Sequence, residues 1–308
     1  MGTVRHDRSN MLARGVFTLH PKEKLDAWNI HDGGTVLVNF RGPETLQPED
    51  LRVIHAVAAA GFAEYRARNG AKLVSPKDER GVVARLELKG DRDVEVTDYQ
   101  TSLRELAEVA GMDRGGDGLT AIFKSLQRIT EVTVWTYVEA PPGTPSHLTK
   151  KVEIEVYGET RILRCSSVES SRLLHAITLK GNGGLRIALN PRETVALLGQ
   201  GRNFTEIDMR EVQKIRGDGT ALLHARMCAF IDHGSSKIIS LHRLEEYVYG
   251  DILAINANPS DLKVRRRMIT RSLSELERIG WVVMKVKDSW RITRPIRPDL
   301  DKAPPGGS

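Results

Sequence analysis

The order of secondary-structure signals after residue 217 restricts the fold more than any other feature of this sequence. Apolar residues at helical spacing predict two helices around a short strand, and then a long third helix with Ser260 and Asp261 at its start. Gly280 ends that helix, and two strand-like segments follow as a hairpin. The predicted ranges are 218–231, 238–240, 241–248, 262–279, 281–286 and 290–293. This order of elements is that of a winged helix.

The first half of the chain contains a similar run of helix, helix and hairpin, with additional strands. A capping-box pattern, Ser102 with Glu105, precedes a helix that Gly111 ends, and a second helix covers 119–129. Before residue 40 we expect irregular chain with a few strand-like segments. The other predicted helix has Pro48 in its first turn and runs to about residue 66. The predicted strands cover 36–40, 82–88, 93–97, 132–138, 151–156, 171–179 and 185–189. The sequence therefore predicts an α+β protein with two winged-helix domains in tandem, the first with extra β-strands.

Composition shifts near Gly199–Arg202, where we place the domain boundary. The predicted division is an N-terminal winged-helix domain at 1–200 and a C-terminal one at 201–296. Residues 297–308 are rich in Pro, Gly and Asp, which predicts a disordered tail.

Positive charge is concentrated near the C-terminus. Residues 263–297 contain eleven basic residues and three acids, an excess larger than the net charge of +6 of the whole chain. A focused basic region attracts polyanions.

The predicted helix 262–279 divides into an apolar and a basic side at 100° per residue. The apolar side is Leu262, Val264, Met268, Ile269, Leu273, Leu276 and Ile279. The other side is Lys263, Arg266, Arg267, Thr270, Arg271, Ser274, Glu277 and Arg278. Arg265 lies on the apolar arc, from which it can reach outward to a phosphate. Because a helix fits the major groove of DNA, where Arg and Lys read guanine, we predict that this helix reads bases.

The hairpin after this helix carries Lys285, Lys287 and Arg291, which we expect to contact DNA beside the helix. Helix 119–129 is a second, less basic candidate reader. Its polar side is Thr120, Lys124, Ser125, Gln127 and Arg128, of which we assign all but Ser125 to DNA contact.

The sequence lacks the motifs of the common nucleotide-dependent and metal-dependent enzymes. It contains no P-loop, no His-Glu-x-x-His and no Cys-x-x-Cys. Its two cysteines, Cys165 and Cys228, are predicted to be packed thiols rather than zinc ligands, and His224 a packing residue. We therefore expect no catalytic residues, no cofactor and no metal. No apolar run is long enough to span a membrane and no signal peptide is evident, so we expect a cytoplasmic protein.

The sequence resembles the RepC replication initiators of IncQ-type plasmids along nearly its whole length. The matching blocks are Val4–Asp7, Gly15–Phe17, Arg41–Glu44, Glu49–Ile54, Ala188–Pro191, Leu222–Asp232, Lys263–Trp281 and Trp290–Pro295. The resemblance implies binding to direct repeats (iterons) in the double-stranded DNA of a plasmid origin and opening of an adjacent AT-rich segment. It also implies two plasmid-encoded partners, a helicase and a primase, and an N-terminal domain that adds DNA contacts or forms a homodimer.

Two other functions remain open at this point. A winged-helix transcriptional repressor would bind one palindromic operator as a stable dimer. A DNA-processing enzyme would nick supercoiled origin DNA with the help of a metal, but no pair of histidines stands near a candidate tyrosine.

Overall fold

A computed structural model gives the structure of the chain over most of its length. It describes residues 3–8, 11, 15–19, 24–31, 35–69, 83–88, 92–156, 159–180, 184–190, 193–194, 196, 204–250 and 259–296. Within these ranges, every helix is too short or too polar to cross a lipid bilayer. The predicted domain boundary at 199–202 and the tail at 297–308 lie outside the described residues.

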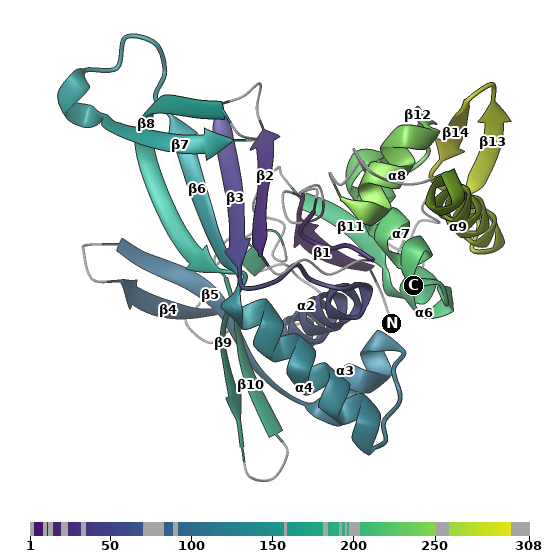
Figure 1. Cartoon of the computed structure of the whole chain (residues 1–308). Coiled ribbons are helices and arrows are strands. Elements are labelled where there is room, and N and C mark those ends of the chain that lie inside the picture. Colours follow the sequence, from purple (N-terminus) through teal and green to yellow (C-terminus); the bar gives the residue numbers. More distant parts are fainter. Residues whose placement is uncertain are drawn as a thin grey trace, which may run out of the picture.

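The C-terminal unit is a winged helix, as predicted (Figure 1). Three helices pack together, and the hairpin after the third pairs with the short strand before the second, giving the sheet order β12-β14-β13. The elements are α7 (Asp218–Phe230), β12 (Ser236–Ser240), α8 (Leu241–Tyr249), α9 (Pro259–Arg278), β13 (Val282–Val286) and β14 (Ser289–Thr293). Helix α9 begins three residues earlier than predicted, because Pro259 takes the first helical position, where a missing N–H costs nothing.

The N-terminal unit repeats this plan. Its helices and wing are α2 (Pro48–Asn69), β5 (Arg92–Ser102), α3 (Leu103–Ala110), α4 (Gly116–Glu131), β9 (Leu174–Leu179) and β10 (Gly184–Leu189). Strands β5-β10-β9 are ordered as β12-β14-β13 are in the C-terminal unit, and β4 (Val83–Leu88) adds to the free edge of β5. The predicted tandem of winged helices is therefore confirmed, although the two halves share no evident sequence repeat.

Local capping explains where the helix α3 begins and ends. The Ser102 hydroxyl accepts a hydrogen bond from the Glu105 backbone N–H at 3.2 Å. Gly111 ends the helix in the left-handed region, with φ at 68°, a conformation that favours glycine. Both capping residues were predicted from the sequence. The Glu105 carboxylate, however, accepts from the Thr101 hydroxyl instead of completing the capping box.

The N-terminal unit carries a second sheet, built from two strands that precede α2 and three that lie between α4 and the wing strands β9 and β10 (Figure 1). Its strand order is β2-β3-β6-β8-β7. The strands are β2 (Leu25–His31), β3 (Val36–Gly42), β6 (Thr133–Glu139), β7 (Lys150–Val156) and β8 (Glu159–Arg172). Strand β8 was not predicted beyond its last residues, because only Leu163 and Cys165 of its side chains are buried and its sequence reads as polar.

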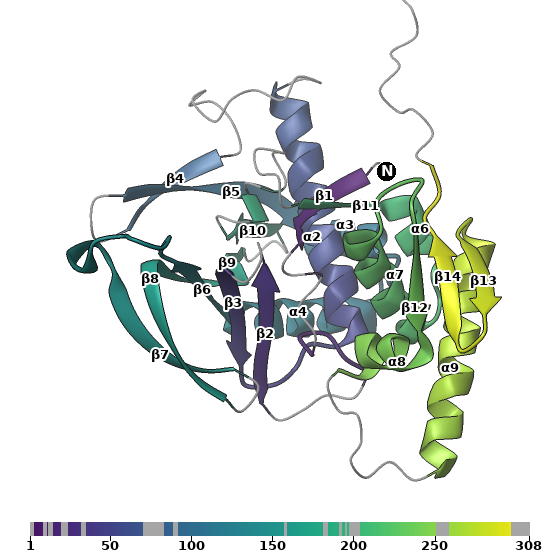
Figure 2. The same ribbon diagram turned by 90° about the horizontal axis from the view of Figure 1, so that it is seen from above.

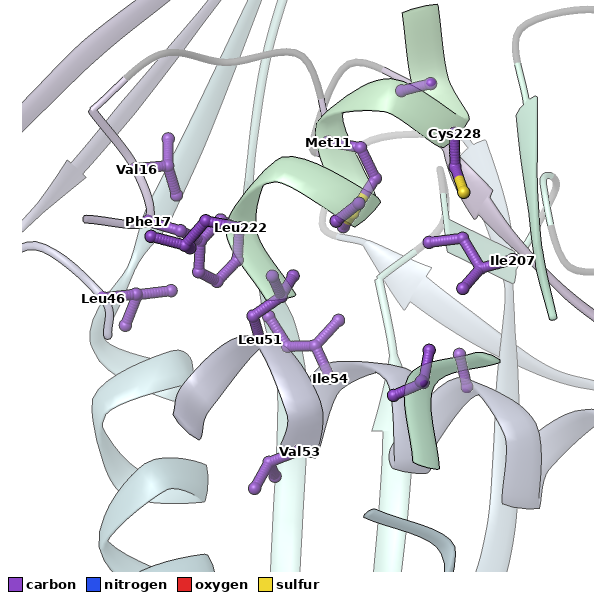
Figure 3. Packing of buried hydrophobic residues seen from close by; sticks show 14 of the residues in the cluster. Met11, Val16, Phe17, Leu46, Leu51, Val53, Ile54, Ile207, Leu222 and Cys228 are labelled. Carbon is purple, nitrogen blue, oxygen red and sulfur yellow. The ribbon is translucent and has the colours of Figure 1, made fainter. Parts of the chain in front are cut away.

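The two halves are joined by backbone pairing and by a continuous apolar core. Strand β1 (Thr3–Asp7) pairs antiparallel with β11 (Phe204–Asp208), which leads into the short helix α6 (Met209–Lys214). The strand-like segments expected before residue 40 are strands β1, β2 and β3, of which the sequence located only β3. Figure 3 shows Leu51 and Ile54 of α2 close to Leu222 of α7, within a single cluster of buried residues.

Candidate nucleic-acid interface

Helix α9 is fixed to the C-terminal unit by its apolar side. Ile269, Leu273 and Leu276 are buried and pack in the core with α7. The two helices approach closely at Gly219, where an added Cβ would lie 2.9 Å from the Ser272 hydroxyl oxygen. These contacts fix the buried side of α9 against α7, so the opposite side of α9 faces solvent.

Glu275 holds the same helix to the start of α7. Its carboxylate accepts hydrogen bonds from the backbone N–H groups of Arg216 and Gly217, at 2.6 and 3.2 Å, and from the Thr220 hydroxyl at 2.6 Å. These donors include free N–H groups at the helix start, where negative charge is favoured. Burial tends to raise the pKa of Glu275, but these bonds and the nearby Arg271 bring the pKa below its ordinary value.

The exposed side of α9 is the basic side predicted from the sequence. Its exposed residues include Lys263, Arg266, Arg267, Thr270, Arg271, Ser274 and Arg278. The Thr270 hydroxyl donates a hydrogen bond to the Arg266 carbonyl at 3.0 Å. Its oxygen can still accept a hydrogen bond from a ligand. Five of these exposed residues are Lys or Arg, and they lie on one side of the helix. This arrangement is expected of a helix that approaches phosphates and base edges.

The placement of Val264 on the buried side is wrong. The residue is 60% exposed, although it lies on the apolar arc of the helical projection. Figure 2 shows that the start of α9 extends past α8, and the exposure of Val264 shows that its side chain is not covered by a neighbouring element.

Helix α8 supports two arginines of α9. The Arg265 guanidinium lies over the Tyr249 ring, 5.0 Å from its centroid. The Arg266 Nε lies 3.9 Å from a Glu245 carboxylate oxygen, and Glu245 is buried. A cation over an aromatic face is held in a narrow range of orientations. Arg265 therefore lies against α8 in this structure, whereas we expected it to extend outward.

The wing places its three predicted contact residues on different sides. Lys287 occupies the turn between β13 and β14 with φ at 53°, and both it and Lys285 are exposed. Arg291 pairs with Met284 on one side and Ile238 on the other. Because side chains alternate along a strand, Arg291 faces away from the buried Ile292 and hence away from the helices.

Helix α4 presents Thr120, Lys124 and Gln127 to solvent. Arg128 is engaged within the fold: its guanidinium donates to both carboxylate oxygens of the fully buried Asp50, with the shortest contact at 2.7 Å. Burial lowers the pKa of Arg128, but the bond to Asp50 and the charge of that carboxylate raise the pKa above its usual value. The expectation that Ser125 faces solvent is wrong, because this residue is buried and its hydroxyl accepts from Arg128.

Sequence reasoning missed the acidic residues that hold this surface in place. Glu275, Glu245 and Asp50 bind partners on other elements, and Asp50 and Arg128 are separated by 78 positions. No pattern of neighbouring residues in the sequence predicts such pairs.

Away from this surface, Glu211, His224 and Cys228 bring three potential metal-ligating atoms within 4.8 Å of one another.

The chain was compared with known families and structures. The family model "Replication protein C (RepC)" matches residues 158–296, which agrees with the resemblance found in the sequence. No curated protein matches.

Among solved structures, RctB domains 2-3 (RctB-155-483) is similar, with a TM-score of 0.51 at 11% identity over 94% of this chain and 96% of that chain. At this identity the likeness concerns the fold alone. The crystal structure of the Pi initiator protein in complex with iteron DNA also matches, with a TM-score of 0.49 at 11% identity, again over 94% and 96% of the two chains.

Proposed function

From the replication protein C match over residues 158–296, we propose that this protein is a plasmid replication initiator that binds direct-repeat iterons in an origin of replication. The exposed basic side of α9 is the observation that carries the proposal. An initiator has to recognise its origin, and an exposed basic helix side is suited to reading DNA. The protein then acts in the cytoplasm of its host, as a DNA-binding protein rather than an enzyme, and without a cofactor.

The long helix α9 enters the major groove. Arg267 and Arg271 suit bidentate contacts to guanine, while Thr270 and Ser274 suit several bases. Lys263, Arg266 and Arg278 contribute phosphate contacts, which add affinity at any sequence and weaken with salt. Arg265 reaches a phosphate only if it leaves the Tyr249 ring. Lys285 and Lys287 at the end of the wing follow the backbone beside the same groove, and Arg291 contacts DNA only if the duplex also reaches the outer face of the wing sheet.

The N-terminal winged helix supplies a second contact. Thr120, Lys124 and Gln127 are exposed on α4, which occupies the position in its unit that α9 occupies in the other. Arg128 contributes by fixing α4 to α2, and it reaches DNA only if it leaves Asp50. Two reading helices on one chain cover a longer site than one, which favours a repeated asymmetric sequence over a short palindrome.

We divide the chain into units at 1–200 and 201–296, followed by a tail. Each unit then contains one DNA-reading helix, α4 in the first and α9 in the second. Arrays of protomers bound at successive iterons deform the origin, and flexible AT-rich steps open at the lowest cost. Opening then gives the plasmid-encoded helicase and primase access to single strands. Besides contacting DNA, the N-terminal unit can pair with that of a second chain to form a homodimer.

A nuclease footprint across the replicon that encodes the protein, made at two salt concentrations, tests the proposal. We expect repeated protections in one orientation, spaced by about two helical turns. A single protected palindrome at a promoter would favour a winged-helix repressor. The absence of protection at both salt concentrations would contradict DNA reading itself, and metal-dependent nicking of supercoiled origin DNA would establish an enzyme.

A further inference from the structure

A cluster of buried polar side chains lies between helices α6 and α7, on the C-terminal unit but away from the basic side of α9. His224 and Cys228 belong to α7, one turn apart, and therefore share one face of the helix. Glu211 reaches the same point from α6. His224 and Cys228 are almost completely buried, while the Glu211 side chain keeps about a fifth of its surface exposed.

Three atoms of different chemical type meet in this cluster. The His224 Nε2 lies 2.7 Å from a Glu211 carboxylate oxygen and 3.6 Å from the Cys228 sulfur. The sulfur and the carboxylate thus approach the same ring nitrogen. This arrangement differs from a catalytic triad, in which the carboxylate binds the nitrogen that faces away from the nucleophile. The three donor atoms lie within 4.8 Å of one another, close enough to share one ion.

We propose that Glu211, His224 and Cys228 form a binding site for a zinc-like divalent metal ion. Thiolate, imidazole and carboxylate are the donor types that zinc accepts, and sites with three protein ligands leave the fourth tetrahedral position to water. The exposed edge of Glu211 provides the side from which the ion and this water enter. Binding requires loss of protons from the Cys228 thiol and from the nitrogen that now faces Glu211, so metal uptake releases protons.

A fourth residue orients the acidic ligand. The Trp281 indole N–H donates to the same Glu211 oxygen at 3.3 Å, and the Trp281 ring packs edge-on against His224, with the ring centroids 5.9 Å apart. Hydrogen bonds of this kind to a metal ligand fix its direction. Trp281 stands at the turn between α9 and β13, so the site connects three parts of the unit.

The location gives the ion a structural role. Helix α6 follows β11, the strand that pairs with β1 from the start of the chain. A bound ion would tie α6 to α7 and thereby fasten the paired strands to the C-terminal winged helix. This role is independent of DNA binding, and its failure would leave the proposed function unaffected.

Cobalt titration of the full-length, chelator-treated protein tests the site. We expect one equivalent of Co²⁺ to bind with a thiolate-to-cobalt absorption band in the near ultraviolet and visible bands of tetrahedral intensity, and zinc to remove both. Cys228→Ser should abolish the thiolate band. Cys165→Ser is the matched control, since Cys165 is also buried but lies in β8, and this variant should keep the band. No thiolate band in the wild type, or one that persists in Cys228→Ser, would overturn the proposal.

Two further measurements keep the test valid if Cys228→Ser folds poorly. Trp281→Phe retains an aromatic ring but loses the donor to Glu211, and it should lower cobalt affinity about 10- to 100-fold. Zinc should raise the melting temperature of the wild type and leave that of Glu211→Gln unchanged. An equal effect of zinc on both proteins would place the ion elsewhere.

Discussion

The Glu275 carboxylate on α9 accepts a hydrogen bond of 2.6 Å from the Thr220 hydroxyl in the first turn of α7. The same carboxylate accepts from the backbone N–H groups of Arg216 and Gly217. One side chain of the proposed reading helix thus binds a hydroxyl in the first turn of α7 and the two backbone N–H groups just before that helix. The orientation of the basic side relative to the rest of the unit depends on this contact.

Replacing Glu275 with Ala should destabilise the protein by about 1–3 kcal/mol, because three donors lose their acceptor. Urea denaturation followed by circular dichroism measures this change. Glu277→Ala is the matched control, since Glu277 is an exposed acid two residues further along the same helix. Equal effects of the two substitutions would show that Glu275 does not anchor α9.

The stability that Glu275 provides should depend on pH. Its pKa is lowered in the folded protein from an ordinary value of 4.5, so the folded state favours the charged form. The contribution is therefore complete above pH 4.5 and is lost as the pH falls through the folded-state pKa. Denaturation of the wild type and of Glu275→Gln at a series of pH values should show a smaller acid-induced loss in the variant, and parallel curves would contradict the assignment.

Arg267→Ala and Arg271→Ala should each weaken binding to the specific site by about 1–3 kcal/mol and relax base preference at one position of the repeat. The reason is that a bidentate arginine contact distinguishes guanine from the other bases. Binding to a panel of singly substituted iterons measures the effect. A uniform loss on every sequence would assign these arginines to phosphates.

Substitutions in the wing test which of its faces meets DNA. Lys285→Ala and Lys287→Ala should weaken binding to all sequences and lower the slope of log affinity against log salt by about one. Arg291→Ala removes the same charge from the outer face, beside Met284 and Ile238. An effect of Arg291→Ala alone would indicate that the duplex lies against this outer face instead.

Arg128→Ala should lower the stability of the protein by about 3 kcal/mol, because the fully buried Asp50 loses its counter-charge. Gln127→Ala, which removes an exposed neighbour on α4, should leave stability unchanged. Thermal melts compare the two variants, and DNA affinity is then measured below the melting range. Normal stability with impaired DNA binding in Arg128→Ala would return Arg128 to the DNA contact surface.

The sequence alone determined the tandem winged-helix plan and the basic side of α9. Both depend on local information: helical spacing of apolar residues, the glycines that end α3 and α9, and the run of arginines after Lys263. Each helix must bury its apolar side, so the opposite side is known before the tertiary structure is. Strand β8 escaped prediction because few of its side chains are buried, and a strand is then defined by its neighbours rather than by its own pattern.

Only the tertiary structure decided which polar residues of these helices are free to meet a ligand. Arg128 and Lys124 look alike in the sequence, yet a carboxylate 78 positions away binds one of them while the other is exposed. Val264 reads as a core residue, yet in the structure its side chain is exposed. Glu211 joins His224 and Cys228 from a different helix. Such contacts depend on how elements distant in the chain pack together. The spacing of residues within one element therefore does not predict them.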